Sequence, residues 1–168
     1  MVVPSLLQTP EYATAIIGST PIPEEEYVRE RVIVRMVRQA VLGRQQPPLR
    51  LKVVLDQSVL HRRIGDRPTM RRQMLRLVEA SERPDTTIQV LSLDCGAHPA
   101  LSGPFAILGF ADGTLPRVFC DGLTGGVLRE GREDVQRYVA CFEKLQDLAL
   151  DATRSLELFQ AAADNYGR

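Results

Sequence analysis

The sequence predicts an α+β fold in which a mostly antiparallel sheet of four to five strands packs with helices. Apolar residues recur at helical spacing near both ends of the chain, and short segments of alternating apolar residues fill its middle. Turns rich in glycine and proline separate these short segments, which favours strands joined by tight connections. At 168 residues the chain fits a single domain, residues 1–168, that buries a core without metal or disulfide.

The first helix follows a short N-terminal stretch. Thr9 is a suitable N-cap, and Pro10 then falls in the opening turn, where its missing N–H does no harm. Gly18 and the prolines Pro21 and Pro23 end this helix.

A longer helix is predicted from about Glu24 to Leu42, completing a helical segment over residues 1–45. Glutamates fill its first turn, where the helix dipole favours negative charge, and Gly43 ends it. One apolar stripe marks the side expected to face the core, and two further residues widen it. The stripe consists of Val28, Val32, Met36 and Ala40, widened by Ile33 and Val37.

Residues 46–130 are expected to form the sheet and a helix that crosses it. Alternating apolar residues from Leu49 to Leu55 predict the first strand, and an amphipathic helix follows from about Pro68 to Glu82. The next strands are predicted in "TTIQVLSLD", "PFAILGFAD" and "LPRVFCDGL", with a short fifth in "LTGGVLRE". Residues 131–168 then read as two helices, "REDVQRYVACFEKLQDLAL" and a last one that Asp151 caps and that runs to about Asn165.

The charge of the chain is balanced but unevenly distributed. Residues 1–84 hold 14 Arg and Lys against 9 Asp and Glu, a net charge of +5, and residues 85–168 carry −5. Specific nucleic-acid binders usually show a stronger basic excess on one face, so this asymmetry suits a homodimer or a protein partner at least as well. Aromatic residues make up only 5% of the chain and tryptophan is absent, which leaves little for stacking on bases or sugars.

The sequence also indicates a cellular compartment. Three cysteines without regular spacing do not form a disulfide framework. The N-terminus lacks the basic start of a signal peptide, and no apolar run approaches the roughly 20 residues of a membrane span. We therefore expect a cytoplasmic protein that does not associate with membranes.

The loop "GAHPALSGPF", residues 96–105, carries one of only two histidines. The spacing Cys95-x-x-His98, with Cys120 as a third ligand, resembles part of a zinc site, but zinc sites usually show a second close pair and none is present. We therefore expect no metal and no cofactor. Glycine patterns typical of phosphate loops are also missing, so nucleotide binding is not expected.

The same loop supplies candidate catalytic residues. His98 could act as a base towards Cys95 or Ser102, with Asp94 or Asp121 orienting it. The alternative is that His98 only braces a rigid loop, and the "GxSxG" motif of hydrolases is absent. The catalytic candidates are thus His98, Asp94 and Asp121. Six further residues are ligand-binding candidates: Ser102, Phe105, Ile107 and Phe110 from the loop and its following strand, and Asp56 and His61 from "LDQSVLHRR".

Five segments resemble, in the same order, a domain of unknown function that is widespread in actinobacterial proteins. They are "VPSLLQTPEYATAII", "RMVRQAVL", "LKVVLDQSVLHRRIG", "TIQVLSLDCGAHPALSGPFAILGF" and "LTGGVLRE". That domain normally follows a helix-turn-helix in antitoxin-like transcriptional regulators, and the resemblance covers Val3 to about Ala162. Here we expect the DNA-binding half to be absent. Gln57 stands where the family usually has an acidic residue, and Ser92, Asp94 and Cys95 stand where it usually has proline and serine.

Two functions remain open at this stage. One is a stand-alone pocket protein of actinobacterial secondary metabolism, such as antibiotic biosynthesis, that binds an apolar metabolite. Such a protein could act on the metabolite as a cofactor-free cyclase or isomerase, because orientation and exclusion of water suffice for this chemistry. The alternative is an orphan effector or dimerisation module of an antitoxin-like regulator, acting through a protein partner. An apolar pocket of roughly 300 Å³ or more beside His98 would favour the first, and a filled interior there would favour the second.

The isolated chain should not bind DNA specifically, because it has no helix-turn-helix pattern and its charge is balanced. In gel-shift assays at physiological salt we expect only weak binding that does not depend on sequence. Nanomolar, sequence-dependent binding would contradict this prediction.

Overall fold

The structure is a computed structural model that describes residues 1–20, 24–122 and 125–168. These residues group into two compact units, one formed by Met1–Val90 with Leu150–Arg168 and the other by Leu91–Ala149. The fold is α+β, as predicted, and each unit contains both helices and strands. Whether the chain behaves as a single domain stays a prediction.

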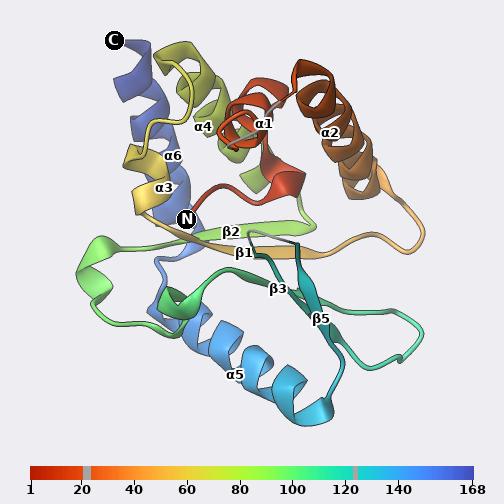
Figure 1. Ribbon diagram of the computed structural model, residues 1–168. Helices are drawn as coiled ribbons and strands as arrows, with labels where there is room; N and C mark the ends of the chain where they lie inside the picture. The colour runs from red at the N-terminus through yellow and green to blue at the C-terminus, as the bar shows by residue number, and fades with distance from the viewer. Residues whose placement is uncertain (21–23, 123–124) are drawn as a thin grey trace. The chain divides into compact units, whose positions relative to one another are not determined.

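The first unit consists of a two-stranded sheet and a layer of helices (Figure 1). Figure 1 shows α1 between α2 and α4, and α4 beside α6. The elements of this unit are α1 (Pro10–Ile17), α2 (Glu25–Arg38), β1 (Leu51–Asp56), α3 (Ser58–His61), α4 (Arg67–Ser81), β2 (Thr86–Leu91) and α6 (Ala152–Gly167).

The predicted sheet of four to five mostly antiparallel strands is wrong. Among the described residues the strands form two sheets, a parallel pair of β1 and β2 and an antiparallel sheet in the order β3-β4-β5. The chain runs through α3 and α4 between β1 and β2, and a crossover helix of this kind returns the chain to the same end of the sheet. The second strand therefore runs parallel to the first, and only the strands with short connections pair antiparallel.

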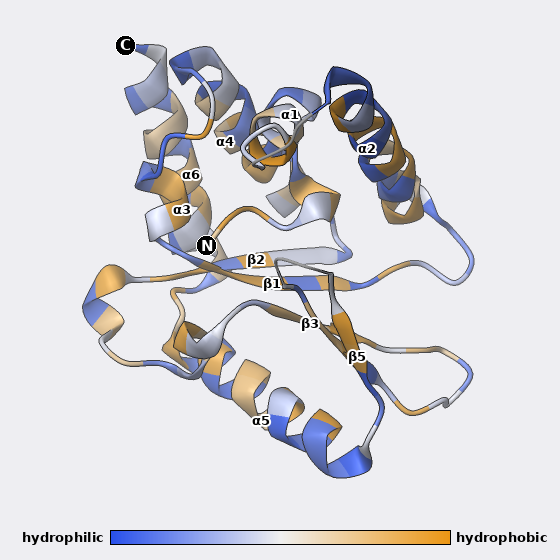
Figure 2. Ribbon diagram, in the orientation of Figure 1, coloured by the Kyte–Doolittle hydropathy of each residue, from blue (hydrophilic) through white to orange (hydrophobic). Residues whose placement is uncertain are grey.

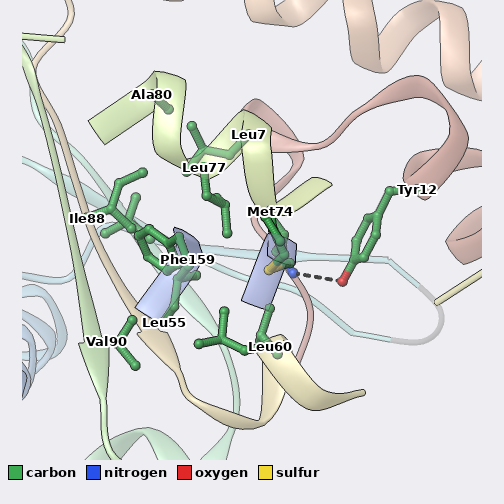
Figure 3. Close-up of a cluster of buried hydrophobic side chains, with 14 of the residues drawn as sticks. Leu7, Tyr12, Leu55, Leu60, Met74, Leu77, Ala80, Ile88, Val90 and Phe159 are labelled. Atoms are coloured by element: carbon green, nitrogen blue, oxygen red, sulfur yellow. Dashed lines mark hydrogen bonds between the residues drawn. The ribbon is translucent and has the colours of Figure 1, made fainter. Parts of the chain in front are cut away.

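The core of the first unit lies between the sheet and the helices. Val53 and Leu55 alternate with less buried neighbours along β1, and Ile88 and Val90 do so along β2, so each strand turns one face to the helices. Figure 3 shows the side chain of Phe159 from α6 at the centre of this cluster. The helices contribute residues at spacings of three and four: Met70, Met74, Leu77 and Ala80 from α4, and Phe159 and Ala163 from α6.

A buried glutamine joins the N-terminal segment to α4. The Gln73 side chain is fully buried, and its Nε2 donates to the carbonyl of Leu7 at 2.8 Å. The backbone N–H of Thr9 donates to Gln73 Oε1, also at 2.8 Å. One amide thus satisfies both a donor and an acceptor of an irregular stretch that has no strand partner.

The same segment holds α2 through long polar side chains. Gln39 Nε2, just beyond the end of α2, donates to the carbonyls of Ser5 and Gln8 at 2.9 and 2.7 Å. Arg35 Nη1 donates to Gln8 Oε1 at 2.6 Å, and Gln8 Nε2 in turn donates to the Val3 carbonyl at 2.6 Å. These bonds fix which side of α2 faces the unit.

Helix ends follow the predicted capping residues where these were identified. Thr9 Oγ1 accepts from the backbone N–H of Tyr12, and Asp151 Oδ1 accepts from that of Arg154, which confirms both predicted N-caps. The long N-terminal helix ends earlier than predicted, at Arg38, and continues as a 3₁₀ turn to Gly43. Pro21 and Pro23, predicted to help end the first helix, lie outside the described residues.

The chain leaves the first unit after Val90 and returns to it at Leu150. The backbone N–H of Leu150 donates to the Val90 carbonyl at 2.9 Å, and the N–H of Val90 donates to Ser155 Oγ at 2.9 Å. The residue at which the chain leaves the first unit is therefore hydrogen-bonded to the residue at which it returns, just before α6.

In the second unit, a three-stranded antiparallel sheet packs on one helix. The elements are β3 (Phe105–Leu108), β4 (Arg117–Cys120), β5 (Val127–Arg129) and α5 (Arg132–Leu148). Phe105 pairs with Cys120 and Ile107 with Val118, so these side chains share the sheet face that packs on α5. Residues 123–124 of the predicted fifth strand lie outside the described residues.

None of the helices in residues 1–20, 24–122 and 125–168 combines the length and apolar composition required to cross a membrane.

Replacing Gln73 with Met should lower the free energy of unfolding by about 2–4 kcal/mol, because it leaves the Thr9 N–H and the Leu7 carbonyl without a partner at nearly constant volume. Chemical denaturation followed by far-ultraviolet circular dichroism measures this change. Arg76→Gln on the same helix is the control: it removes only an exposed ion pair with Glu79 and should cost less than about 1 kcal/mol. Equal losses in the two variants would contradict the role given to Gln73.

Candidate functional site

A small pocket in the second unit collects three of the residues predicted from the sequence. Ser102, Phe105 and Asp121 line it, and its volume is about 130 Å³. It lies between the sheet and α5, with the loop of residues 99–104 along its rim. The remaining lining residues are Pro99, Gly103, Pro104, Cys120, Tyr138 and Cys141.

Local geometry explains why a thiol and a phenol meet in this pocket. Cys120 is directly opposite Phe105 in the antiparallel pair, so both side chains lie on the face turned to α5. The Cys120 Sγ lies 3.2 Å from the Tyr138 Oη, and the rings of Phe105 and Tyr138 are 5.0 Å apart between centroids. Cys141 follows one turn after Tyr138 on α5, so both reach the same side of that helix.

This contact changes the acidity of the phenol. The hydrogen bond with Cys120 raises the pKa of Tyr138, and partial burial adds to that effect. Burial also raises the pKa of the Cys141 thiol, which keeps it protonated and a poor nucleophile at neutral pH.

The volume of the pocket admits only a small ligand. About 130 Å³ holds a handful of atoms, well below the roughly 300 Å³ of usual small-molecule sites. The polar groups at its wall are thiols, a phenol, a hydroxyl and a carboxylate, which stand beside Phe105 and two prolines, and neither histidine is among the described residues that line it.

The two other catalytic candidates lie elsewhere in the second unit. His98 is 9% exposed and directly precedes the 3₁₀ turn Pro99–Ser102, and its carbonyl accepts from the N–H of Leu101 at 3.2 Å. Asp94 is exposed on a short turn, where its N–H donates to Ser92 Oγ. The structure thus places Asp121 at the pocket but neither His98 nor Asp94 among its lining residues.

Four ligand-binding candidates also take other positions. Ile107 lies in β3 opposite Val118, and Phe110 is exposed with the Arg117 guanidinium 5.7 Å from its ring centroid. Asp56 and His61 belong to the first unit. There Asp56 Oδ1 accepts from the N–H of Ser58, and the exposed His61 ends α3.

The described residues contain no group of three or more His, Cys, Asp or Glu that could hold a metal ion. Cys95, His98 and Cys120 therefore do not assemble into the three-ligand site considered from their spacing.

A larger groove, of about 370 Å³, lies on the second unit and was not foreseen from the sequence. Its floor is formed by the α5 residues Val135, Val139 and Ala140, and charged groups such as Glu130 and Arg132 stand at its edge. Leu115, Pro116, Gln136 and Glu143 complete its lining. It contains none of the residues predicted as catalytic or ligand-binding.

The most exposed apolar helix face in the described chain belongs to α2 and the turn after it. The predicted core stripe was only partly correct: Val28 is buried, but Ile33 and Val37, expected to widen it, are 56% and 68% exposed. Three more large side chains lie on the same outward side, which we call the α2 outer face. It consists of Tyr27, Ile33, Val34, Val37 and Val41.

Comparison with known proteins places the chain in a family. The family model DUF5753, described as a domain of unknown function, matches residues 1–161. The chain belongs to the DUF5753 family. Neither a curated protein nor a solved structure matches it. The DUF5753 match spans both compact units, so the pocket, the groove and the α2 outer face all lie within the matched region.

In Cys120→Ala, the pKa of Tyr138 should fall towards the ordinary value of a phenol, because the hydrogen bond that raises it is lost. A pH titration followed by NMR of ¹³C-labelled tyrosine Cζ resolves Tyr138 from the other three tyrosines. Cys95→Ala serves as the control, since Cys95 does not line the pocket and should leave the Tyr138 titration unchanged. An unchanged pKa in Cys120→Ala would show that the thiol does not set the acidity of Tyr138.

Proposed function

We propose that this chain is a protein-interaction module that binds its partner through the α2 outer face. The observation that carries the proposal is the exposure of five large apolar side chains on one side of α2 and the turn after it. Contiguous exposed apolar surface of this kind is uncommon on monomeric proteins and typically marks an interaction site.

Two features of the second unit make a small-molecule function the weaker proposal. The pocket near the 96–105 loop has a volume of about 130 Å³, below that of usual small-molecule sites. The sheet face that carries Ile107, Val118 and Cys120 packs on α5 and is not open to a ligand. An apolar metabolite, and a cofactor-free cyclisation of it, would require a larger and drier cavity than this pocket, and the groove of about 370 Å³ holds none of the predicted catalytic or ligand-binding residues.

The sequence resemblance agrees with an interaction role. We propose that the module is of the kind found in antitoxin-like transcriptional regulators of actinobacteria, where a domain of this type follows a DNA-binding helix-turn-helix. In such a regulator, the output depends on which protein surface the domain engages. The α2 outer face, which is apolar and flanked by charged residues such as Glu30 and Arg38, suits a module of this kind.

A photo-crosslinking amino acid placed at Val37 tests the proposal. In cells that naturally make the protein, irradiation should join position 37 to a protein and give an adduct of one defined mass, because Val37 lies in the middle of the α2 outer face. Mass spectrometry of the purified adduct measures that mass and identifies the joined chain.

The matched control is the same amino acid at Val127, a comparably exposed valine (55%) on β5 in the second unit, which should give no defined adduct. Absence of an adduct at position 37 would contradict the proposal. So would a metabolite that raises the melting temperature of the protein and loses that effect in Asp121→Asn.

A further inference from the structure

We infer that the partner of the α2 outer face is a second copy of this chain, bound with its α2 antiparallel to the first. This inference rests on the proposed function and names its partner. Three observations carry it: the spacing of the apolar residues along α2, the distribution of charge along the same helix, and the way its opposite side is anchored.

The apolar residues follow a helix–helix seam. Tyr27, Val34 and Val41 are spaced seven residues apart, and Val37 falls three after Val34, which is the pattern of two helices that pack along their length. In Figure 2, orange apolar positions recur along α2 between blue hydrophilic ones. Ile33 broadens the seam by one residue on its flank.

Charge along α2 favours an antiparallel arrangement. Residues 24–31 hold four glutamates and two arginines, whereas residues 32–44 hold three arginines and no acidic residue. Two parallel copies would bring like charges together, and two antiparallel copies bring the acidic end of each helix to the basic end of the other. With the two-fold axis at Val34, Glu30 of one copy lies opposite Arg38 of the second, and Tyr27 lies opposite Val41.

The opposite side of α2 cannot contact a second copy, because it already packs on the first unit. Val28 is buried there, and Arg35 and the following Gln39 hold Gln8 and Ser5 through side-chain hydrogen bonds. The outer face is therefore presented in one fixed orientation. Such preorganisation lowers the entropic cost of association.

The size of the face sets the expected affinity. A helix of 14 residues is about 21 Å long and about 10 Å across. It covers only part of the ~800 Å² that each partner contributes to a standard interface. We therefore expect a reversible dimer with a dissociation constant on the order of 10 μM, visible as a rise in mass with concentration.

Sedimentation equilibrium of the full chain between about 1 and 300 μM tests self-association. Val34→Glu should weaken the dimer at least tenfold, because it places two glutamates opposite each other at the two-fold axis. Val127→Glu introduces the same change at a similarly exposed valine of the second unit and should leave the dimer unchanged. A wild-type chain that stays monomeric throughout this range overturns the inference, as does equal weakening by both variants.

A charge exchange tests the orientation. Glu30→Arg and Arg38→Glu should each weaken the dimer about three- to tenfold, since each places like charges opposite one another. The double variant restores opposite charges in the antiparallel arrangement and should return to within about threefold of the wild-type dissociation constant. No recovery in the double variant overturns the antiparallel pairing. Circular dichroism of all four proteins checks that α2 still folds.

The crosslinked mass separates failure of this inference from failure of the proposed function. An adduct at position 37 of twice the chain mass supports both. An adduct with a different protein, together with a monomeric chain in sedimentation, overturns self-association and leaves the interaction module in place. No adduct and no dimer overturns both.

Discussion

Three glutamine side chains hold the N-terminal stretch of the chain, and the arrangement of the first unit depends on them. Gln73 reaches from the core helix α4 to the backbone of residues 7 and 9. Gln8 and Gln39 then connect that stretch to α2. Because residues 3–9 pair with no strand, these amides supply the hydrogen bonds that a sheet would otherwise give. The position of α1, the orientation of α2 and the direction of its outer face all follow from the hydrogen bonds of these three glutamines.

Much of the secondary structure could be predicted because its signals are local. Thr9 and Asp151 cap helices as expected, and alternation from Leu49 to Leu55 located the first strand to within two residues. The sheet could not be predicted from the same signals, since strand direction depends on what connects the strands. A helix between two strands indicates a parallel pair, as β1 and β2 form. The short turns later in the chain indicate antiparallel pairing only for the strands that they connect. The one-turn helix α3 is too short to leave a periodic pattern.

The sites were less accessible to sequence reasoning, for the same reason. Proximity to His98 in sequence suggested Ser102 and Phe105, residue type suggested Asp121, and all three line one pocket. Tyr138 and Cys141 complete it from α5, and only the packing of that helix on the sheet brings them there. On α2, apolar residues occur on nearly every side, so periodicity could not decide which side is buried. Arg35 and Gln39 decide it through partners about 30 residues earlier in the chain.

The bond between Leu150 and Val90 gives residues 91–149 the character of an inserted module. The chain enters and leaves this stretch at two points that are hydrogen-bonded to each other just before α6. Loop closure becomes more costly only slowly as a loop lengthens. Evolution could therefore enlarge, shorten or replace the segment, with its pocket and its groove, without repacking Phe159 or its neighbours. The first unit thus acts as a frame, and residues 91–149 act as a cassette that can acquire a new specificity at a different rate.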